Sequence, residues 1–307
     1  MPERLMSLHR GKFNDDKLYW TTFNGSFWTG DAEFSNGARS KSCPAVTIFN
    51  GTLYCVHRGK DDDDKLWYCT FDPATEKWSE DHEFEADNRS SDGPAIAAFK
   101  GSLYCVHKGK DHDQTLYWCV FDPVVREWSP DTPFSNGNQT NAPPALINVN
   151  DQTLYCVHRG NEKNDHLWFT TFDASSQIWY SDTEFLQGNL SYRGVGLAYY
   201  DSKVFCAHRG QSARLGTKNL WWCYLDGANW TTDFEFTNGN QSVDGPALCV
   251  YQGTLYCVHR GTDDNDHLFY SKLNGSGPTD WVWSTDTIFH GENRSTDGPA
   301  LIVVNFP

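Results

Sequence analysis

The sequence predicts an all-β fold, a six-bladed β-propeller of four-stranded antiparallel blades. The first observation behind this prediction is a tripeptide, His-(Arg/Lys)-Gly, that recurs six times along the 307 residues at intervals of 48 to 51 residues. The second is a set of strand-like segments inside each interval, and the third is a motif, Trp-x-x-Asp-x-x-Phe, near its end. Repeats of this length with strand-like segments are typical of propeller blades. The tripeptides begin at His9, His57, His107, His158, His208 and His259.

Residues 44–90 show how one repeat forms four strands. Asn50-Gly51 is a tight-hairpin signal between the first two strands. Aromatic and β-branched residues, which favour sheets, are frequent in the second and third. The expected strands are residues 45–49, 52–58 and 66–71 and an outer strand at Trp78. Four antiparallel strands per repeat make one propeller blade.

The outer strand carries the Trp-x-x-Asp-x-x-Phe motif in all six repeats. Because blades bury both faces, an outer strand still needs large rings, and we expect the Trp and Phe to pack between blades. The tryptophans are Trp28, Trp78, Trp128, Trp179, Trp230 and Trp283, each with its Phe six residues later.

The two ends of the chain complete the ring. Residues 299–304 match the innermost strand of the other repeats, whereas the first repeat begins at Leu5 with its second strand. We therefore expect the C-terminal strand to join the N-terminal blade, which removes exposed sheet edges. The whole chain is expected to form one domain whose blades are residues 299–307 with 5–35, then 44–85, 94–135, 144–186, 195–237 and 246–290.

Composition and charge narrow the partners. The net charge of −15 argues against binding to nucleic acid or anionic membranes, which requires a basic surface. No run of 18 apolar residues predicts a membrane span. No signal segment precedes the first repeat, so we expect a cytoplasmic protein or one exported without a signal peptide. The sequence leaves the oligomeric state open.

Most of the ten cysteines occupy two positions in the repeat. Pairing of the second and third strands places Cys55 opposite Cys69 and Cys105 opposite Cys119. At both positions other repeats have Ser or Thr, which indicates a small buried residue rather than a disulfide framework. Free thiols are expected, as in a reducing compartment.

Polar residues converge on one rim of each blade. The loop after His-(Arg/Lys)-Gly and the loop that leads to the next blade open on the same face, because strands in a blade alternate in direction. The second of these loops carries an Asn four residues after the Phe of the motif, and Ala38 is the exception. The asparagines are Asn88, Asn138, Asn189, Asn240 and Asn293.

Cross-strand pairing places an aromatic ring beside each of these histidines. If Arg58 faces Leu66, then His57 faces Trp67. A ring next to hydrogen-bonding groups suits a sugar, whose C–H face packs on the ring while its hydroxyls bind the polar groups. The Arg or Lys could instead bind a carboxylate or phosphate. The candidate carbohydrate-binding residues are His9, Arg10, Tyr19, His57, Arg58, Trp67, Asn88, His107, Lys108, Tyr117, Asn138, His158, Arg159, Trp168, Asn189, Asn240, His259, Arg260, Phe269 and Asn293.

Each of these groups also has a purely structural interpretation. The His could bind a loop carbonyl, the Arg could pair with the Asp of the Trp-x-x-Asp motif, and the Asn could shape a turn. The acidic run 61–64 is expected to be a solvated loop, because no repeat has the oxygen spacing of a calcium cage. No metal, no cofactor and no catalytic residue are expected.

The fifth repeat departs from the others. Its loop at 211–219 is longer and lacks an acid, and residues 193–196, Arg-Gly-Val-Gly, replace the Asp-Gly-Pro-Ala found at Asp92, Asp244 and Asp297. If the sites are repeated, this one is expected to be altered or inactive.

The repeat, of the form Gly-Pro-Ala-(Leu/Ile)…Leu-Tyr-Cys-Val-His-Arg-Gly…Leu-Trp-Tyr…Phe-Asp…Trp-Ser, resembles those of fungal and bacterial β-propeller lectins, the tectonin-like or Photorhabdus-lectin-like groups. The resemblance covers the whole chain. It implies several shallow carbohydrate sites between adjacent blades. Six repeats instead of seven, and the lack of calcium loops, mean that their sugar cannot be transferred.

These observations predict a multivalent carbohydrate-binding lectin whose partners are glycans. Several weak sites on a rigid ring gain by avidity, on the order of 10²-fold or more. A protein-interaction scaffold is an alternative, although such proteins usually diversify their rim loops. A sialidase-like glycosidase is a further alternative. It needs a single asymmetric site, whereas the candidate residues recur around the ring, so we expect that the chain is not an enzyme.

Overall fold

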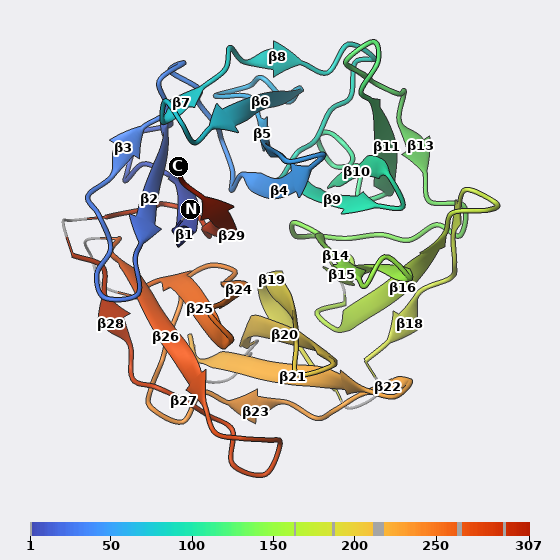
Figure 1. Cartoon of the computed structure of the whole chain (residues 1–307). Coiled ribbons are helices and arrows are strands. Elements are labelled where there is room, and N and C mark those ends of the chain that lie inside the picture. The colour runs from blue at the N-terminus through green and yellow to red at the C-terminus, as the bar shows by residue number, and fades with distance from the viewer. Residues whose placement is uncertain (1, 163, 186–187, 211–217, 263–265, 291–292) are drawn as a thin grey trace.

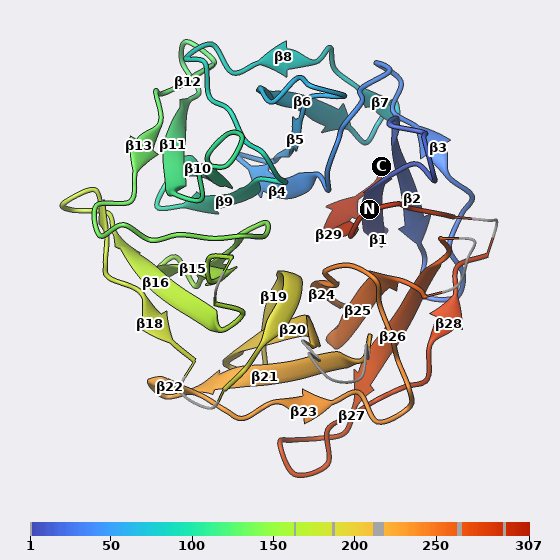
Figure 2. The same cartoon turned by 180° about the vertical axis from the view of Figure 1, so that it is seen from behind.

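The computed structural model describes residues 2–162, 164–185, 188–210, 218–262, 266–290 and 293–307. These residues form 29 β-strands in six antiparallel sheets arranged as a ring, and none of them lies in a helix long and apolar enough to cross a membrane. Figures 1 and 2 show the six sheets around a central axis, with both ends of the chain in the same blade. The predicted six-bladed β-propeller is confirmed.

Blade 2 illustrates the arrangement of strands. From the axis outward the order is β4 (Ala45–Phe49), β5 (Thr52–Arg58) and β6 (Leu66–Asp72). The outer edge consists of two short strands, β7 (Lys77–Trp78) and β8 (His82–Glu83), which both pair with β6. The predicted outer strand is therefore interrupted. Asp81, in the segment between β7 and β8, lies 3.1 Å from His57 Nε2.

The other blades repeat this order. Blade 1 contains β29 (Ala300–Asn305), β1 (Glu3–Arg10), β2 (Leu18–Phe23) and β3 (Ala32–Glu33). Blade 3 contains β9 (Ala95–Phe99), β10 (Ser102–Lys108), β11 (Leu116–Asp122), β12 (Glu127–Trp128) and β13 (Thr132–Pro133). Blade 4 contains β14 (Ala145–Val149), β15 (Thr153–Arg159), β16 (Leu167–Asp173), β17 (Ile178–Trp179) and β18 (Thr183–Glu184).

The last two blades follow the same scheme. Blade 5 contains β19 (Ser191–Tyr200), β20 (Lys203–Gly210), β21 (Leu220–Asp226), β22 (Asn229–Trp230) and β23 (Phe234–Glu235). Blade 6 contains β24 (Ala247–Tyr251), β25 (Thr254–Arg260), β26 (Leu268–Asn274), β27 (Val282–Trp283) and β28 (Thr287–Ile288).

The ring closes as predicted. Strand β29, from the C-terminus, pairs antiparallel with β1 near the N-terminus, with Leu5 opposite Val303. Closure gives β1 the inner neighbour that β4 provides to β5 in blade 2, so β1 is not left as an unpaired edge.

Adjacent blades are joined by stacked rings of the Trp-x-x-Asp-x-x-Phe motif. The Trp of one blade stacks on the Phe of the preceding blade, as at Phe34 and Trp78, whose ring centroids are 3.9 Å apart. The same stack recurs at every interface, and the last one, Phe289 on Trp28, joins blade 6 to blade 1 at 4.0 Å. The predicted packing between blades is confirmed. Stacked pairs of this kind contribute about 0.5–1.5 kcal/mol each beyond their buried area.

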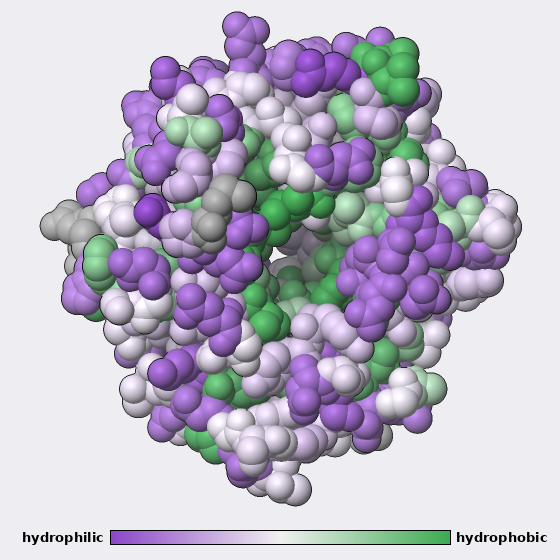
Figure 3. All heavy atoms as spheres, in the orientation of Figure 1, coloured by the Kyte–Doolittle hydropathy of each residue, from purple (hydrophilic) through white to green (hydrophobic). Residues whose placement is uncertain are grey.

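Inner strands converge on an apolar cavity along the axis. Figure 3 shows the hollow at the centre of the ring with hydrophobic residues around it, and prolines at the starts of the inner strands line it, including Pro44, Pro94 and Pro144. The segments that enter the inner strands touch one another here. A Cβ on Gly245 would lie 2.7 Å from the carbonyl oxygen of Gly194, so only glycine fits.

The cysteines at the two repeat positions lie inside the blades. Cys55 is opposite Cys69 and Cys105 is opposite Cys119, as predicted, and all four side chains are buried thiols. Burial raises the pKa of the Cys69 and Cys119 thiols, which keeps them protonated.

Candidate functional site

The Asp of the Trp-x-x-Asp motif is the centre of a hydrogen-bond network at each blade interface. Between blades 3 and 4, Asp182 Oδ1 lies 3.0 Å from His158 Nε2 of its own blade. The same oxygen accepts a hydrogen bond from Asn138 Nδ2 of the preceding blade. The His and Asn side chains are buried, at most 3% exposed, whereas the aspartates are 18–23% exposed.

This network recurs with one variation. The histidines His9, His57, His107, His158, His208 and His259 each pair with the Asp of their own blade. The asparagines Asn88, Asn138, Asn189, Asn240 and Asn293 each donate to the Asp of the next blade. The Asp of the motif therefore pairs with His and Asn. The structural interpretation in which the Arg pairs with this Asp is wrong.

The basic residue of the tripeptide lies on the other face of the blade. Successive residues of a strand point to opposite faces, so Arg159 diverges from His158, and its Nε donates to the carbonyl of Ser191 at 2.9 Å. Arg10 pairs with Asp297 at 3.0 Å, and Arg260 donates to the carbonyl of Thr296 at 2.7 Å. Thr296 and Asp297 precede the inner strand β29, and Ser191 begins the inner strand β19. The structure thus separates the predicted His and Arg, and places the Arg toward the axis.

The predicted aromatic partners stand where the cross-strand pairing placed them. His9 is opposite Tyr19, His57 opposite Trp67, His107 opposite Tyr117, His158 opposite Trp168 and His259 opposite Phe269. All five rings are partly exposed. In the altered fifth blade, Trp221 occupies the equivalent position opposite His208.

An acid in the loop after the tripeptide holds the ring in blades 1 to 3. Trp67 Nε1 donates to Asp63 Oδ2 at 3.0 Å, and Tyr19 Oη donates to Asp15 Oδ2 at 2.8 Å. A side chain at Gly59 would collide with Asp63, which explains the glycine of the tripeptide. Asp63 was not among the candidate residues. The sequence led us to expect that the acidic run 61–64 is a solvated loop, whereas Asp63 holds the ring and Asp64 binds Arg89.

Pockets lie at the interface between blades 1 and 2 and at the interface between blades 3 and 4. The pocket between blades 1 and 2 has a volume of about 210 Å³, and the pocket between blades 3 and 4 about 170 Å³. The first is lined by Asn36, Gly37, Ala38, Arg39, His57, Gly59, Lys60, Asp63, Trp67 and Asp81. The second is lined by Gly137, Gln139, His158, Gly160, Asn161, Asn164, Trp168 and Asp182. Each therefore combines an aromatic wall with a His–Asp pair.

In the second pocket the ring lacks a partner that the first pocket provides. Asn164 stands where Asp63 stands in blade 2, and Trp168 Nε1 has no hydrogen-bond partner within the described ranges. A buried indole N–H normally finds an acceptor.

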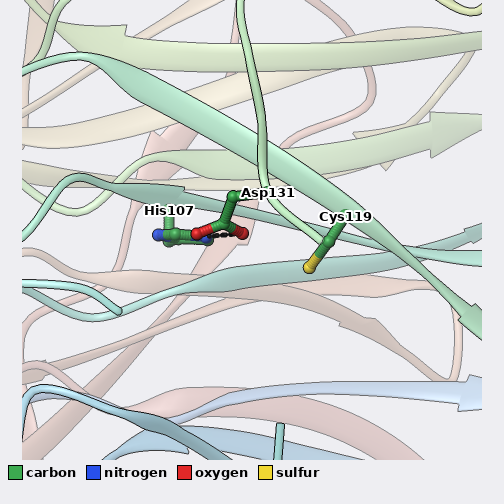
Figure 4. A group of neighbouring side chains, drawn as sticks. All are labelled: His107, Cys119 and Asp131. Atoms are coloured by element: carbon green, nitrogen blue, oxygen red, sulfur yellow. Dashed lines mark hydrogen bonds and ion pairs between the residues drawn. The ribbon is translucent and has the colours of Figure 1, made fainter. Parts of the chain in front are cut away.

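One group of side chains in the described part of the chain could hold a metal ion. The donor atoms of His107, Cys119 and Asp131 lie within 4.8 Å of one another (Figure 4). His107 already pairs with Asp131 at 2.8 Å, and Asn88 donates to the same carboxylate at 2.5 Å. The His–Asp pair is also present in blade 4, where Thr170 replaces the thiol. The pair therefore does not depend on a thiol-bound metal.

The mouth of the axial cavity is acidic and asymmetric. It is lined by Asp92, Asp244 and Asp297 together with Arg193 and Arg260, and its volume is about 150 Å³. Burial, together with the nearby charge of Asp297, raises the pKa of Asp244 to about 6. Burial also raises the pKa of Asp92. The repeats of blades 2 and 4 have no acid at this position, so the arrangement belongs to the ring as a whole.

The fifth blade differs on its axial side. Arg193 stands in place of the Asp, and the guanidinium of Arg209 lies 4.2 Å from the centroid of the Tyr192 ring. His208 keeps its pairing with Asp233 at 2.9 Å. The longer loop without an acid consists mainly of residues 211–217, which lie outside the described residues.

Comparisons with known proteins support the fold. No protein-family profile and no curated protein sequence match the chain. Among solved structures it is similar to a triple arginine-to-alanine mutant of AofleA from Arthrobotrys oligospora, with a TM-score of 0.65 and 11% identity over 95% of this chain and 83% of that one. It is also similar to a GH43_1 enzyme from Xanthomonas citri complexed with xylose, with a TM-score of 0.53 and 11% identity over 79% and 89% of the two chains.

A third similar structure is an α-L-arabinofuranosidase of the GH43 group from Clostridium thermocellum. Its TM-score is 0.53, with 13% identity over 83% of this chain and 95% of that one. At these identities the likeness shows the β-propeller fold. It does not single out the tectonin-like or Photorhabdus-lectin-like groups.

These neighbours correct one expectation. The sequence led us to expect that the chain is not an enzyme, but most of the similar structures are glycoside hydrolases of the GH43 group. The expectation rested on the sameness of the repeated rim residues. It overlooked the axial carboxylates, which differ from blade to blade and form the kind of asymmetric group that was taken to be missing.

Proposed function

We propose that the protein is a multivalent carbohydrate-binding lectin, akin to the tectonin-like or Photorhabdus-lectin-like groups, with shallow sugar sites between adjacent blades. The observation that carries the proposal is the pocket between blades, which joins a partly exposed ring to a partly exposed carboxylate. Both features recur around the ring. A repeated shallow site serves avidity on a repetitive glycan surface.

The chemistry of the pocket suits a saccharide. The C–H face of a sugar can pack on Trp67 or Trp168, while its hydroxyls donate to Asp81 or Asp182. A hydroxyl bound to a carboxylate makes a charge-assisted bond, stronger than a neutral one. In this account the aromatic residues of the predicted set touch the sugar, and the buried His and Asn hold the Asp in place.

Substitution of the ring tests the proposal. Trp67→Ala and Trp168→Ala should each weaken binding of the best glycan from an array by tenfold or more at the affected site. Phe27→Ala is the matched control, because it removes an exposed ring that lies outside the pockets. No glycan binding at high protein concentration, or wild-type binding by both tryptophan variants, would contradict the proposal.

The axial carboxylates support a second candidate function, hydrolysis of glycosides. A carboxyl group with its pKa raised to about 6 by burial, such as Asp244, is suited to general acid catalysis near neutral pH. Asp297 and Asp92 at the same mouth supply further carboxylates, and paired carboxylates are what glycoside hydrolysis requires. The similar GH43 enzymes favour testing this candidate.

Release of nitrophenol from aryl xylosides, arabinosides and galactosides measures hydrolysis directly. Activity that disappears in Asp244→Asn and persists in Trp67→Ala would assign it to the axial cavity. If the wild type hydrolyses every substrate no faster than Asp244→Asn does, the second candidate function is contradicted and sugar binding alone remains.

A further inference from the structure

The interface between blades 1 and 2 lacks the Asn found at the other five. Ala38 occupies the position of Asn88, Asn138, Asn189, Asn240 and Asn293. Each of those asparagines donates a hydrogen bond to the Asp of the next blade. Ala38 cannot donate such a hydrogen bond. Asp81, the Asp of the next blade, therefore lacks one of the two side-chain donors found at the other interfaces.

Asn36 replaces one of the two hydrogen bonds that the Asn makes at the other interfaces. Asn88 Nδ2 binds both the Asp131 carboxylate and the carbonyl of Ser129, the latter at 3.1 Å. At the variant interface Asn36 Nδ2 donates to the corresponding carbonyl, that of Ser79, at 2.6 Å. Within the described ranges, no side-chain amide donates to Asp81, and His57 is its hydrogen-bond partner.

The geometry of His57 at this interface differs from that of the equivalent His in blades 3 to 6. Its Nε2 lies 3.1 Å from both oxygens of Asp81. In blades 3 to 6 the equivalent nitrogen lies 2.8–3.0 Å from one oxygen, the one that also accepts the amide of the Asn. One shared proton therefore serves both oxygens of Asp81, which leaves capacity to accept further hydrogen bonds.

The pocket between blades 1 and 2 reaches the residue that replaces the Asn. Both Ala38 and Asp81 line the pocket between blades 1 and 2. Between blades 3 and 4, Asp182 lines the pocket but Asn138 does not, because it lies buried against the carboxylate. The larger volume, about 210 Å³ against about 170 Å³, agrees with the loss of the amide.

We propose that the pocket between blades 1 and 2 is the principal saccharide site, in which a hydroxyl of the sugar takes the place of the missing Asn amide and donates to Asp81. This inference rests on the proposed function. The sugar ring would pack on Trp67, whose indole is fixed by Asp63. The sugar hydroxyl contributes to binding, because without it the partly buried carboxylate of Asp81 lacks a hydrogen-bond donor.

The test fills the space with the residue that the other interfaces use. Ala38→Asn should restore the amide–Asp81 bond, keep the melting temperature of the wild type or raise it, and weaken the tightest class of sites in calorimetric titration at least tenfold. Asn138→Ala is the matched opposite variant. It should leave Asp182 with a free acceptor in the pocket between blades 3 and 4 and raise the number of tight sites by one.

Monodeoxy analogues of the best-binding sugar test the inference without a variant. One analogue should bind the wild type at least tenfold more weakly than the parent sugar, and Ala38→Asn should no longer distinguish the two. Unchanged affinity and stoichiometry in Ala38→Asn, with a native melting transition, would overturn the inference while leaving the lectin proposal intact. A wild-type protein that binds no glycan would instead overturn the lectin proposal itself.

Discussion

At the scale of single residues, the Asp of the Trp-x-x-Asp motif links structure to the proposed site. It accepts hydrogen bonds from a buried His of its own blade and, at five interfaces, from a buried Asn of the preceding blade. Its remaining exposure faces the pocket. All three residue types were recognisable in the sequence, which placed His and Asn among the candidate binding residues, whereas we propose that the Asp contacts the sugar. Burial explains the difference, because a motif does not reveal which member of a network remains exposed.

The His is expected to act by supporting this carboxylate. His158→Ala should lower the free energy of unfolding by about 1–3 kcal/mol, because Asp182 and the Arg159 carbonyl lose a buried partner. Urea unfolding measures the change. The exposed His112→Ala should stay within about 0.5 kcal/mol of the wild type. An equally small effect of His158→Ala would contradict this role.

His57 predicts a specific dependence of stability on pH. Burial alone would lower the pKa of His57, but the charge of Asp81 and its hydrogen bond outweigh it and raise the pKa from 6.5 to about 9. Since the folded protein holds this proton more tightly than the unfolded chain, the contribution is full below about pH 6.5 and is lost as the pH rises through about 9. The shift corresponds to at most about 3 kcal/mol.

Denaturant unfolding of the wild type and of His57→Gln at pH 6 and pH 9.5 measures this contribution. The difference in stability between the two proteins should be larger at pH 6. A difference that is constant with pH, or larger at pH 9.5, would show that His57 is not protonated beside Asp81.

At the scale of elements, the outer edge of each blade differs most from the sequence-based expectation. The motif Trp-x-x-Asp-x-x-Phe predicted one outer strand, whereas blades 2 to 6 have two short strands, such as β7 and β8, with the Asp between them. A strand period alone does not show this break, which lies where Asp81 contacts His57, a residue distant in the sequence. The inner three strands and their register were predicted well, since hairpin signals and aromatic alternation are local.

The stacked Trp and Phe of adjacent blades should couple energetically. Phe134→Ala and Trp179→Ala should each cost about 3–5 kcal/mol, because both rings are buried. A double-mutant cycle by urea unfolding should give a coupling of about 0.5–1.5 kcal/mol. Val124→Ala, on an exposed turn, serves as the control. A coupling indistinguishable from zero would mean that the two rings contribute separately.

At the scale of the whole molecule, the repeat made the ring predictable and also hid its asymmetry. Six similar units and an unpaired first strand led directly to closure by β29. The sequence already showed where blades differ, as at Ala38 and at residues 193–196, but not which of these positions lie together. Asp92, Asp244 and Asp297 meet at the axial mouth, and Ala38 lines the pocket between blades 1 and 2. These contacts become visible only when the ring brings the six repeats together.

A crystal structure of the protein with the best glycan from an array tests the central claim most directly. The account predicts a sugar between blades 1 and 2, packed on Trp67 with a hydroxyl donating to Asp81, and further copies at equivalent interfaces such as Trp168 and Asp182. A sugar bound solely in the axial cavity beside Asp244, with the pockets between blades empty, would contradict it.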